Sequence, residues 1–320
     1  MNIFYVYKKY KEAYGNPISV MWRINRGDEF IPVILKDRKR VWERYYIQNY
    51  AKIIKSFPSR SKELADFYDS IQESNHGDTD ENGQFITFEY NNKHLKFYGV
   101  IENNTIVNGA IDEVFFYEDY KFLSSKDAVV IDIGANIGDT AIYFCLNNAE
   151  RVIALEPFPY SFNFATMNIT TNNLADKIEL LKAGYGKDSV VSVETSKSNG
   201  LSLFHPIERG DKIRIYSLKT LLDNYGLNGR DDLSLKMDCE GCEYNLLLET
   251  FETLKKFKKI QIEFHYGYKN LILKLEEAGF SVTHGALVKS GGKDVTLKNT
   301  ALANRDLTFG YIYAERDGKN

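Results

Sequence analysis

Four side chains in the last third of the chain have the chemistry to remove a proton from a substrate or to hold a cation. Asp238 and Glu240 follow one apolar run, and Glu263 and His265 end the next one. Both runs have the composition of buried strands, so the four groups are expected at strand ends, with Glu263 and His265 on one face. We predict that Asp238, Glu240 and His265 are catalytic, with His265 as the general base because imidazole titrates near neutral pH.

Other roles for these residues stay open. Asp238, Glu240, Glu263 and His265 could together bind a divalent metal that lowers the pKa of a substrate hydroxyl. We assign no metal ligand and treat the metal as the less favoured alternative. His265 could also have a purely structural role, as a hydrogen-bonded histidine at the end of a strand. Glu243 is interpreted as an acid in the first turn of the next helix, where it favours the positive end of that helix.

A glycine turn after the strand expected at residues 129–133 indicates a second site. Gly134 and Gly138 are spaced as in a nucleotide-binding turn, but Asn136 replaces the glycine that lets the backbone approach a pyrophosphate. Asp132, just before the turn, suits a ligand that carries a cationic amino group. The pattern therefore argues against a dinucleotide.

The next expected strand ends in Glu156, which lies 22 positions after Gly134. In this kind of fold a carboxylate at that position takes both ribose hydroxyls. A nucleoside joined to an amino acid satisfies both halves of the pattern, and S-adenosylmethionine is such a molecule. The residues predicted to bind this cofactor are Asp132, Gly134, Ala135, Asn136, Gly138, Asp139, Glu156, Pro157, Gly184 and Tyr185.

The order of these elements predicts an α/β fold with a Rossmann-like, doubly wound and mostly parallel sheet, preceded by an N-terminal α/β appendage. We expect three segments: a basic hairpin and helix appendage over residues 1–75, a β-hairpin lead-in over 76–125, and the cofactor-binding domain over 126–320. Residues 188–216 are expected to form an inserted hairpin, and a single helix is expected after Tyr244.

Charge is distributed unevenly over the first part of the chain. Residues 1–60 hold 13 basic against 5 acidic side chains, whereas residues 61–120 hold 3 against 13. We prefer the interpretation that the two segments pack and neutralise each other. The expected helix over 38–57, which is basic at its start and rich in aromatics, could instead contact a membrane surface or a polyanion. A hairpin over 17–36 and a short helix over 62–71 should flank it.

Residues 78–89 satisfy the calcium-loop pattern of an EF-hand. The following residues 85–98 alternate as a hairpin, which would leave Glu89 in a strand and unable to close the loop on an ion. We therefore do not expect calcium binding.

The remaining composition is that of a water-soluble protein. Nothing approaches 18 consecutive apolar residues, and the first residues lack the apolar length of a signal peptide, so we expect a cytoplasmic protein. Three cysteines, Cys145, Cys239 and Cys242, do not make a disulfide framework. A zinc site on the last two would need two further ligands.

Three segments together resemble the FkbM family of S-adenosylmethionine-dependent methyltransferases: residues 132–138, the pair Glu156 and Pro157, and residues 235–244. The resemblance covers about residues 85–284 and implies a class I methyltransferase domain, with the first 75 residues outside it. It also implies methylation of an oxygen, often on sugars of glycans, glycolipids or antibiotics. The last segment is similar to the family's K-x-D-x-E-G-x-E signature, matched by Lys236, Asp238, Glu240, Gly241 and Glu243.

We therefore expect a methyltransferase that acts on a sugar hydroxyl or carboxylate of a glycan, a glycolipid or a related small molecule. One alternative is the methylation of RNA or another macromolecule through the basic N-terminal segment, although nucleic acid is the less expected partner. A non-catalytic nucleotide-binding Rossmann protein is the other. Residues 187–216 and the appendage should shape the acceptor pocket, but neither carries a readable motif.

Overall fold

The computed structural model describes residues 3–56, 58–73, 78–99, 110–124, 126–193, 210–289 and 308–316, and the chain divides into two compact units, Met1–Tyr117 and Glu118–Asn320. The segments 100–109 and 194–209, which fall within the expected lead-in over 76–125 and the expected inserted hairpin over 188–216, lie outside the described residues. Within the described helices, no stretch combines the length and the apolar character needed to span a bilayer.

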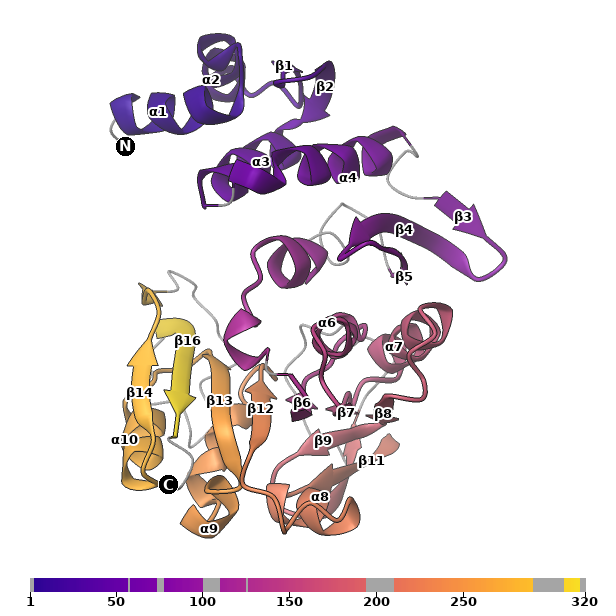
Figure 1. The fold of residues 1–320 in the computed structure, drawn as a ribbon, viewed down its shortest axis with the longest axis vertical. Coiled ribbons are helices and arrows are strands. Elements are labelled where there is room, and N and C mark those ends of the chain that lie inside the picture. Colours follow the sequence, from indigo (N-terminus) through magenta and orange to yellow (C-terminus); the bar gives the residue numbers. More distant parts are fainter. Residues whose placement is uncertain are drawn as a thin grey trace. The chain divides into compact units, whose positions relative to one another are not determined.

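The second unit is built on one large sheet (Figure 1). Its helices and strands are η4 (Lys121–Leu123), β6 (Val129–Ile133), α6 (Asp139–Leu146), β7 (Arg151–Leu155), α7 (Pro159–Thr171), β8 (Ile178–Leu181), β9 (Ala183–Tyr185), β10 (Ser189–Val193), β11 (Asp211–Tyr216), α8 (Leu218–Asn224), β12 (Leu233–Met237), η5 (Cys242–Leu248), α9 (Phe251–Leu254), β13 (Phe257–Phe264), α10 (Lys269–Glu277), β14 (Ser281–His284), β15 (Val288–Lys289) and β16 (Thr308–Glu315).

The strands of the large sheet follow the order β14-β16-β13-β12-β6-β7-β8, and β15 pairs with β16 beside this path. From β8 to β13 all neighbours are parallel, whereas β16 runs antiparallel to both β13 and β14. The strand order reverses between β6 and β12, which makes their carboxyl ends the topological switch point where ligands bind in such sheets. The predicted fold class, a doubly wound and mostly parallel α/β sheet, is confirmed.

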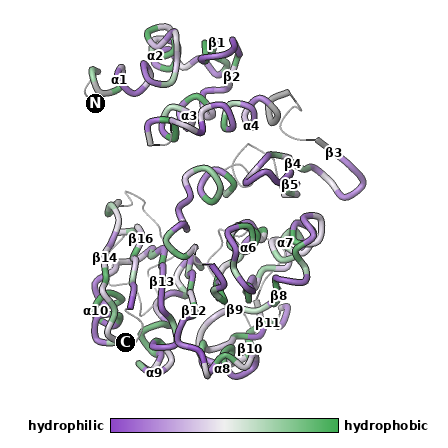
Figure 2. The backbone as a smooth tube through the Cα atoms, viewed as in Figure 1, coloured by the Kyte–Doolittle hydropathy of each residue, from purple (hydrophilic) through white to green (hydrophobic). Residues whose placement is uncertain are grey.

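The two faces of this sheet are chemically different. Residues Val129, Ile131 and Ile133 of β6 join one apolar cluster with buried residues of α8, η5, α9 and α10. Because side chains alternate along a strand, Asp132 must point to the other face, where Thr140 at the start of α6 reaches it. The helix α6 is buried along its whole length and is mostly hydrophobic (Figure 2).

Two local predictions in this unit can be compared with the structure. The inserted hairpin is confirmed where it is described, since β10 and β11 pair antiparallel, and β11 also pairs with β9. The single helix expected after Tyr244 is wrong, because a 3-10 turn, η5, ends at Leu248 and a separate short helix, α9, begins at Phe251. The break occurs because Thr250 is extended and caps α9 by accepting the Thr253 N–H at 3.1 Å.

The first unit contains four helices and two small antiparallel sheets in its described residues. Its elements are α1 (Ile3–Ala13), α2 (Pro17–Arg26), β1 (Phe30–Ile34), β2 (Lys39–Glu43), α3 (Arg44–Ser56), the 3-10 turn η1 (Pro58–Arg60), α4 (Ser61–Glu73), β3 (Asp78–Asp80), β4 (Gly83–Tyr90), β5 (Lys93–Tyr98) and the π-helical turn η3 (Asp112–Phe116).

The hairpin predicted over residues 17–36 is displaced along the chain. Pro17 opens helix α2 at a position where its missing N–H costs nothing, and Gly27 ends the helix with a φ of 90°. The hairpin is instead β1 with β2, so the helix predicted to begin at residue 38 begins only at Arg44. The prediction gave too much weight to a weak strand-like alternation over these residues and too little to the proline and glycine that delimit a helix.

The aromatic stripe predicted on the basic helix faces the core of this unit. On α3, Tyr46, Ile47 and Tyr50 are buried, and Trp42 before it donates to Asp69 from its indole N–H. The hairpin predicted over residues 85–98 is also confirmed as β4 and β5. Strand pairing places Glu89 opposite His94, away from any ion-binding loop.

Asp112 is the least exposed acid among the described residues of the first unit and lies in its aromatic core. It is 2% exposed, and its Oδ2 accepts hydrogen bonds from the Tyr68 hydroxyl at 3.0 Å and from Asn49 Nδ2 at 3.3 Å. Burial raises the pKa of Asp112 to about 8, although the two hydrogen bonds act in the opposite direction. The carboxyl group is therefore mostly protonated at neutral pH.

Replacing Asp112 by Asn should remove part of the pH dependence of stability. In the wild type the folded pKa is raised from 3.8 to about 8, so the unfolded chain ionises first and the free energy of unfolding falls between those values. The slope from one such group is about 1.4 kcal/mol per pH unit. Urea unfolding of both proteins from pH 4 to pH 8 measures the difference, and parallel profiles would contradict the assignment.

Candidate active site

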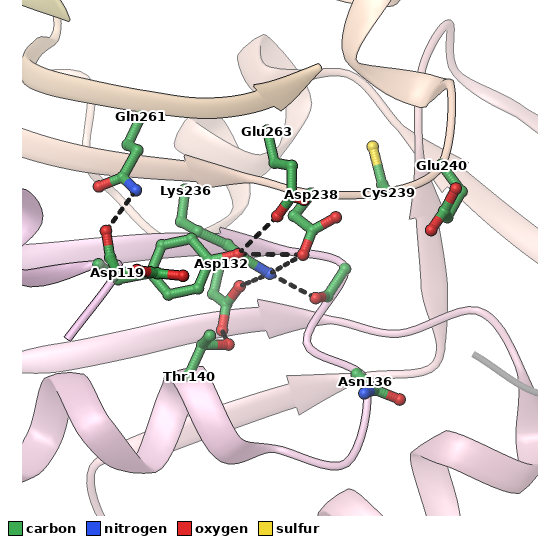
Figure 3. A network of polar contacts seen from close by, with 12 residues as sticks. Asp119, Asp132, Asn136, Thr140, Lys236, Asp238, Cys239, Glu240, Gln261 and Glu263 are labelled. Carbon is green, nitrogen blue, oxygen red and sulfur yellow. Dashed lines mark hydrogen bonds and ion pairs between the residues drawn. The ribbon is translucent and has the colours of Figure 1, made fainter. Parts of the chain in front are cut away.

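An ionic row crosses the polar face of the large sheet. The strand register puts Lys236 of β12 beside Asp132 of β6 and beside Gln261 of β13, so the three side chains share one face. Lys236 and Asp132 are 1% and 0% exposed, and their Nζ and Oδ1 atoms lie 3.2 Å apart. The Lys236 Nζ also donates to the Gly134 carbonyl at 2.6 Å and lies 3.9 Å from Asp238 Oδ2 (Figure 3).

The charge of Lys236 is maintained by its acidic neighbours. Burial by itself lowers the pKa of this lysine, but Asp132, Asp238 and Asp139 raise it, and the net direction is upward. An ammonium group without such partners would lose its proton in so dry a site. Asp132 is also bonded through its second oxygen, because Oδ2 accepts a hydrogen bond from the Thr140 hydroxyl at 2.6 Å. Both groups thus link β6, β12 and the start of α6.

The glycine turn after β6 is in direct contact with the turn after β12. Gly134 has a φ of 82°, and a Cβ built on it would lie 1.8 Å from the carbonyl oxygen of Asp238. Gly138 has a φ of 84°, and a Cβ built on it would lie 3.3 Å from Ala165 of α7, a tight contact that a shift of a few tenths of an ångström relieves. Close approach therefore requires glycine at 134, whereas at 138 the left-handed backbone is the stronger reason for it. Ala135 is buried between them.

Glu156 links the glycine turn to the end of β7. One of its oxygens accepts the Asn136 N–H and the other accepts the Phe158 N–H, both at 2.9 Å. The side chain is 3% exposed, and burial raises its pKa to about 8 against the opposing effect of the two N–H groups. Burial likewise raises the pKa of Asp139, at the start of α6, to about 7. Glu156 and the glycine turn, predicted to share one cofactor, thus lie together.

The remaining residues predicted to bind the cofactor lie at the adjacent strand ends. Gly184 of β9 is next to Pro157, since an added Cβ would lie 3.8 Å from the proline Cβ and 2.9 Å from Ile215 Cδ1. Tyr185 is buried in the apolar core, and its hydroxyl donates to Glu249 at 3.2 Å.

Tyr120 connects two acids of the predicted catalytic region. Its hydroxyl donates to Asp238 Oδ2 at 3.0 Å and lies 3.4 Å from Glu263 Oε2. The tyrosine is buried, which raises its pKa well above the ordinary value, so it remains a hydrogen-bond donor. The sequence analysis does not single out Tyr120, because it is one of several aromatic residues before β6 and no spacing pattern distinguishes it from the others.

His265 is held by two other acids of the signature segment. Its Nδ1 lies 2.8 Å from Glu243 Oε1, and its Nε2 lies 3.6 Å from Glu240 Oε2. Glu243 is fully buried, and its second oxygen accepts the Gly241 N–H at 2.8 Å. Burial lowers the pKa of His265, but Glu243 and the nearby Asp238 and Glu240 raise it to a net value of about 10. His265 is therefore an imidazolium at neutral pH.

A disulfide bond between Cys239 and Cys242 closes a small loop around Glu240. Within this loop Glu240 has a φ of 54° and Gly241 a φ of 117°. The sequence did not predict this bond, because the two cysteines were considered for a multi-disulfide framework or for zinc. The cross-link helps to hold Glu240 in a backbone conformation that non-glycine residues seldom adopt.

Asp238, Glu263 and His265 each offer one donor atom, and these atoms lie within 4.8 Å of one another. A divalent cation could bridge groups at such a spacing. These are three of the four residues for which the sequence left a divalent metal open, and Asp238 also accepts the Tyr120 hydroxyl. The same cluster could instead serve proton transfer and charge stabilisation.

Residues 132–282 match the family model of the methyltransferase FkbM domain. No curated protein matches the chain. Among solved structures, precorrin-6y C5,15-methyltransferase from Geobacter metallireducens GS-15 is 15% identical, with a TM-score of 0.40 over 69% of this chain and 94% of that one. M. jannaschii TYW2 in complex with AdoMet is 15% identical, with a TM-score of 0.37 over 73% and 87%. Methyltransferase FkbM from Methylobacillus flagellatus KT is 17% identical, with a TM-score of 0.38 over 59% and 44%.

Lys236→Met should destabilise the second unit strongly, because it leaves the buried Asp132 carboxylate without its cation. Breaking a buried ion pair on one side costs roughly 3 to 5 kcal/mol. The double variant Lys236→Met/Asp132→Asn should recover part of that loss in chemical unfolding followed by circular dichroism. Lys219→Met removes an exposed lysine that pairs with Asp223 at 2.6 Å, and it should change little. Equal effects of the two lysine substitutions would contradict the structural role of Lys236.

Glu243→Gln should lower the pKa of His265 from its raised value. The neutral amide keeps the shape of the side chain but removes the negative charge 2.8 Å from Nδ1. Loss of such a neighbour shifts a pKa by about 1 to 3 units. Two-dimensional NMR of the imidazole nitrogens, with His265→Gln used to assign the signal, follows the titration. A His265 signal that titrates near pH 6.5 in the wild type would show that the ion pair is absent.

Proposed function

Residues 132–282 belong to the methyltransferase FkbM family, and from this we propose that the protein, an S-adenosylmethionine-dependent methyltransferase, methylates an oxygen atom of its acceptor. The proposed acceptor is a sugar hydroxyl or carboxylate on a glycan, a glycolipid or a related small molecule. The carboxylates around the switch point support the assignment of oxygen for a hydroxyl acceptor, because a hydroxyl must lose its proton when it is methylated, whereas a carboxylate acceptor would need no base.

The contact between the two turns supports this proposal most directly. The absence of a Cβ at Gly134 lets the backbone of Asp238 approach the glycine turn. A donor held by that turn would therefore lie beside the Asp238 carboxylate, and an acceptor oxygen between the two would have the methyl group on one side and a base on the other. Positioning of this kind accounts for a large part of the rate of an in-line displacement.

Glu156 is proposed to bind the ribose of the cofactor. Two backbone N–H groups already fix its carboxylate, so little orientational freedom is lost when the ribose hydroxyls arrive. Asp132 is proposed to act indirectly. Its carboxylate is occupied by Lys236 and Thr140, and Lys236 in turn holds the Gly134 carbonyl. Asp132 is thus a positioning residue for the turn.

Asp238 is proposed as the general base instead of His265. Its side chain is 30% accessible and its backbone lies against Gly134 of the glycine turn, whereas Glu240, which is 29% accessible, lies beside His265, and His265 keeps its proton at neutral pH. In the proposed step the acceptor oxygen attacks the methyl carbon, the carbon–sulfur bond breaks to leave neutral S-adenosylhomocysteine, and the acceptor proton moves to Asp238. The charged His265, next to Glu240, would orient the acceptor's polar groups.

Two variants should separate cofactor binding from chemistry. Asp238→Asn should leave the affinity for S-adenosylmethionine nearly unchanged in isothermal titration while reducing kcat by about 10² to 10⁴, the usual contribution of a general base. Glu156→Gln should instead weaken cofactor binding by about tenfold, because the amide presents a donor to groups that need an acceptor. Asp223→Asn, an exposed acid on α8, is the control.

The acceptor class is tested by mass spectrometry of host glycans and lipids incubated with the protein and S-adenosylmethionine. A component that gains the mass of one methylene group with the wild type, and not with Asp238→Asn, would identify the acceptor. Methylation found solely on nucleic acid or protein nitrogen would contradict the proposal, as would full turnover in Asp238→Asn.

A further inference from the structure

The hairpin β1–β2 of the first unit carries an exposed apolar face. The strand register places Pro32 opposite Val41 and Ile34 opposite Lys39, so these residues point to the same side. Phe30 shares that side by alternation along β1. Phe30 is 56% exposed, Val41 58% and Ile34 38%. Large apolar side chains are thus gathered on a surface in contact with water.

The opposite face of the same hairpin is already used for the core. Ile31, Val33 and Trp42 alternate with the exposed residues and are at most 1% accessible. An antiparallel ribbon with one buried face normally presents polar side chains on the other. Here both faces are apolar, a pattern that indicates a second surface which covers the outer face.

The edge of β1 is not available for an added strand. The Gly15 N–H donates to the Ile34 carbonyl at 2.7 Å, and the Asn16 amide donates to the Pro32 carbonyl at 3.0 Å while accepting the Ile34 N–H at 2.8 Å. Residues 15 and 16 therefore occupy the hydrogen-bonding positions at this edge. A partner must use the apolar face itself rather than extend the sheet.

The charges around this face select an anionic partner. Lys39 lies on the face and Lys36 lies in the turn beside it, and both are exposed and form no ion pair with any described residue. Of the nearby acids, Asp28 pairs with Arg26 at 2.7 Å and Asp37 pairs with Arg38 at 2.6 Å, Glu43 opposite Phe30 is buried, and Glu29 is exposed.

Residues 1–60 as a whole hold 13 basic against 5 acidic side chains. A second copy of the chain would bring the same positive charge to the interface, which disfavours self-association through this face. Anionic headgroups above an apolar layer match both the charge and the hydrophobicity.

Helix α2, which packs beside β1, adds two exposed apolar residues one turn apart. Ile18 is 71% exposed and Trp22 is 58% exposed, and the guanidinium of Arg26 lies 4.6 Å from the centre of the Trp22 ring. Tryptophan and arginine side chains favour the boundary between headgroups and acyl chains.

We propose that the outer face of the β1–β2 hairpin (Phe30, Pro32, Ile34, Lys39 and Val41) docks the protein on the headgroup region of an anionic lipid bilayer, with α2 beside it. This surface replaces the membrane contact considered for the helix over residues 38–57, whose aromatic stripe is buried in the core. The proposal goes beyond the proposed methyl transfer and does not depend on it.

Sedimentation of the full-length protein with vesicles tests this inference. Vesicles of phosphatidylcholine with phosphatidylglycerol should bind at least about tenfold more tightly than phosphatidylcholine alone, and added salt should weaken binding. The double variant Phe30→Ser/Val41→Ser should bind about tenfold more weakly, and Lys36→Glu/Lys39→Glu should show a loss of similar size. The matched control is Val190→Ser/Leu273→Ser, which changes two residues that are each 55% exposed in the second unit and should bind as the wild type does.

Thermal unfolding of each variant should match that of the wild type because all of the substituted side chains are exposed. Binding lost in the hairpin variants and kept in the control supports the proposal. Wild-type binding by Phe30→Ser/Val41→Ser would overturn it, even if the lysine variant binds less, because the contact would then be purely electrostatic. If the wild type binds neither kind of vesicle but dimerises through Phe30 and Val41, the proposal is also overturned, and the face is then assigned to contact with a second copy of the chain.

Discussion

The ion pair between Lys236 and Asp132 is the interaction on which the rest of the second unit depends. Two charges in a site without water are tolerated only when each is neutralised and hydrogen-bonded. Here the ammonium satisfies the Asp132 carboxylate and the Gly134 carbonyl together, so one lysine joins the central strands β6 and β12 and also fixes the turn between strand and helix. Geometry at the switch point and stability of the sheet therefore have the same physical origin.

Burial of these side chains also determines which groups of the candidate site can gain or lose a proton near neutral pH. Tyr120 stays a donor because burial raises its pKa, and His265 stays charged because Glu243 is close and fully buried. Asp238, whose side chain is 30% exposed, lies between a hydroxyl donor and an ammonium group. Asp238 can therefore accept a proton, whereas the charges of Lys236 and His265 stay unchanged at neutral pH.

The sequence predicted the parts of this site that depend on local spacing. The glycine turn and the signature around Asp238 are contiguous patterns, and parallel-strand rules bring their ends together. What it could not predict depends on contacts between distant residues: the pairing of His265 with Glu243, the Tyr120 bridge and the raised pKa values. The hairpin in the first unit was misplaced for the opposite reason, since the local signals of Pro17 and Gly27 were outweighed by a weak alternation.

The position of β16 has a consequence for how the protein is made. This strand lies between β13 and β14, and it is translated after both of them. Until residues 308–315 have left the ribosome, β13 has an open edge and β14 lacks the neighbour that it pairs with in the finished sheet. The sheet can therefore be completed only after β16 has been synthesised. Until then the nascent chain exposes a strand edge that can bind a chaperone or pair with another chain and aggregate.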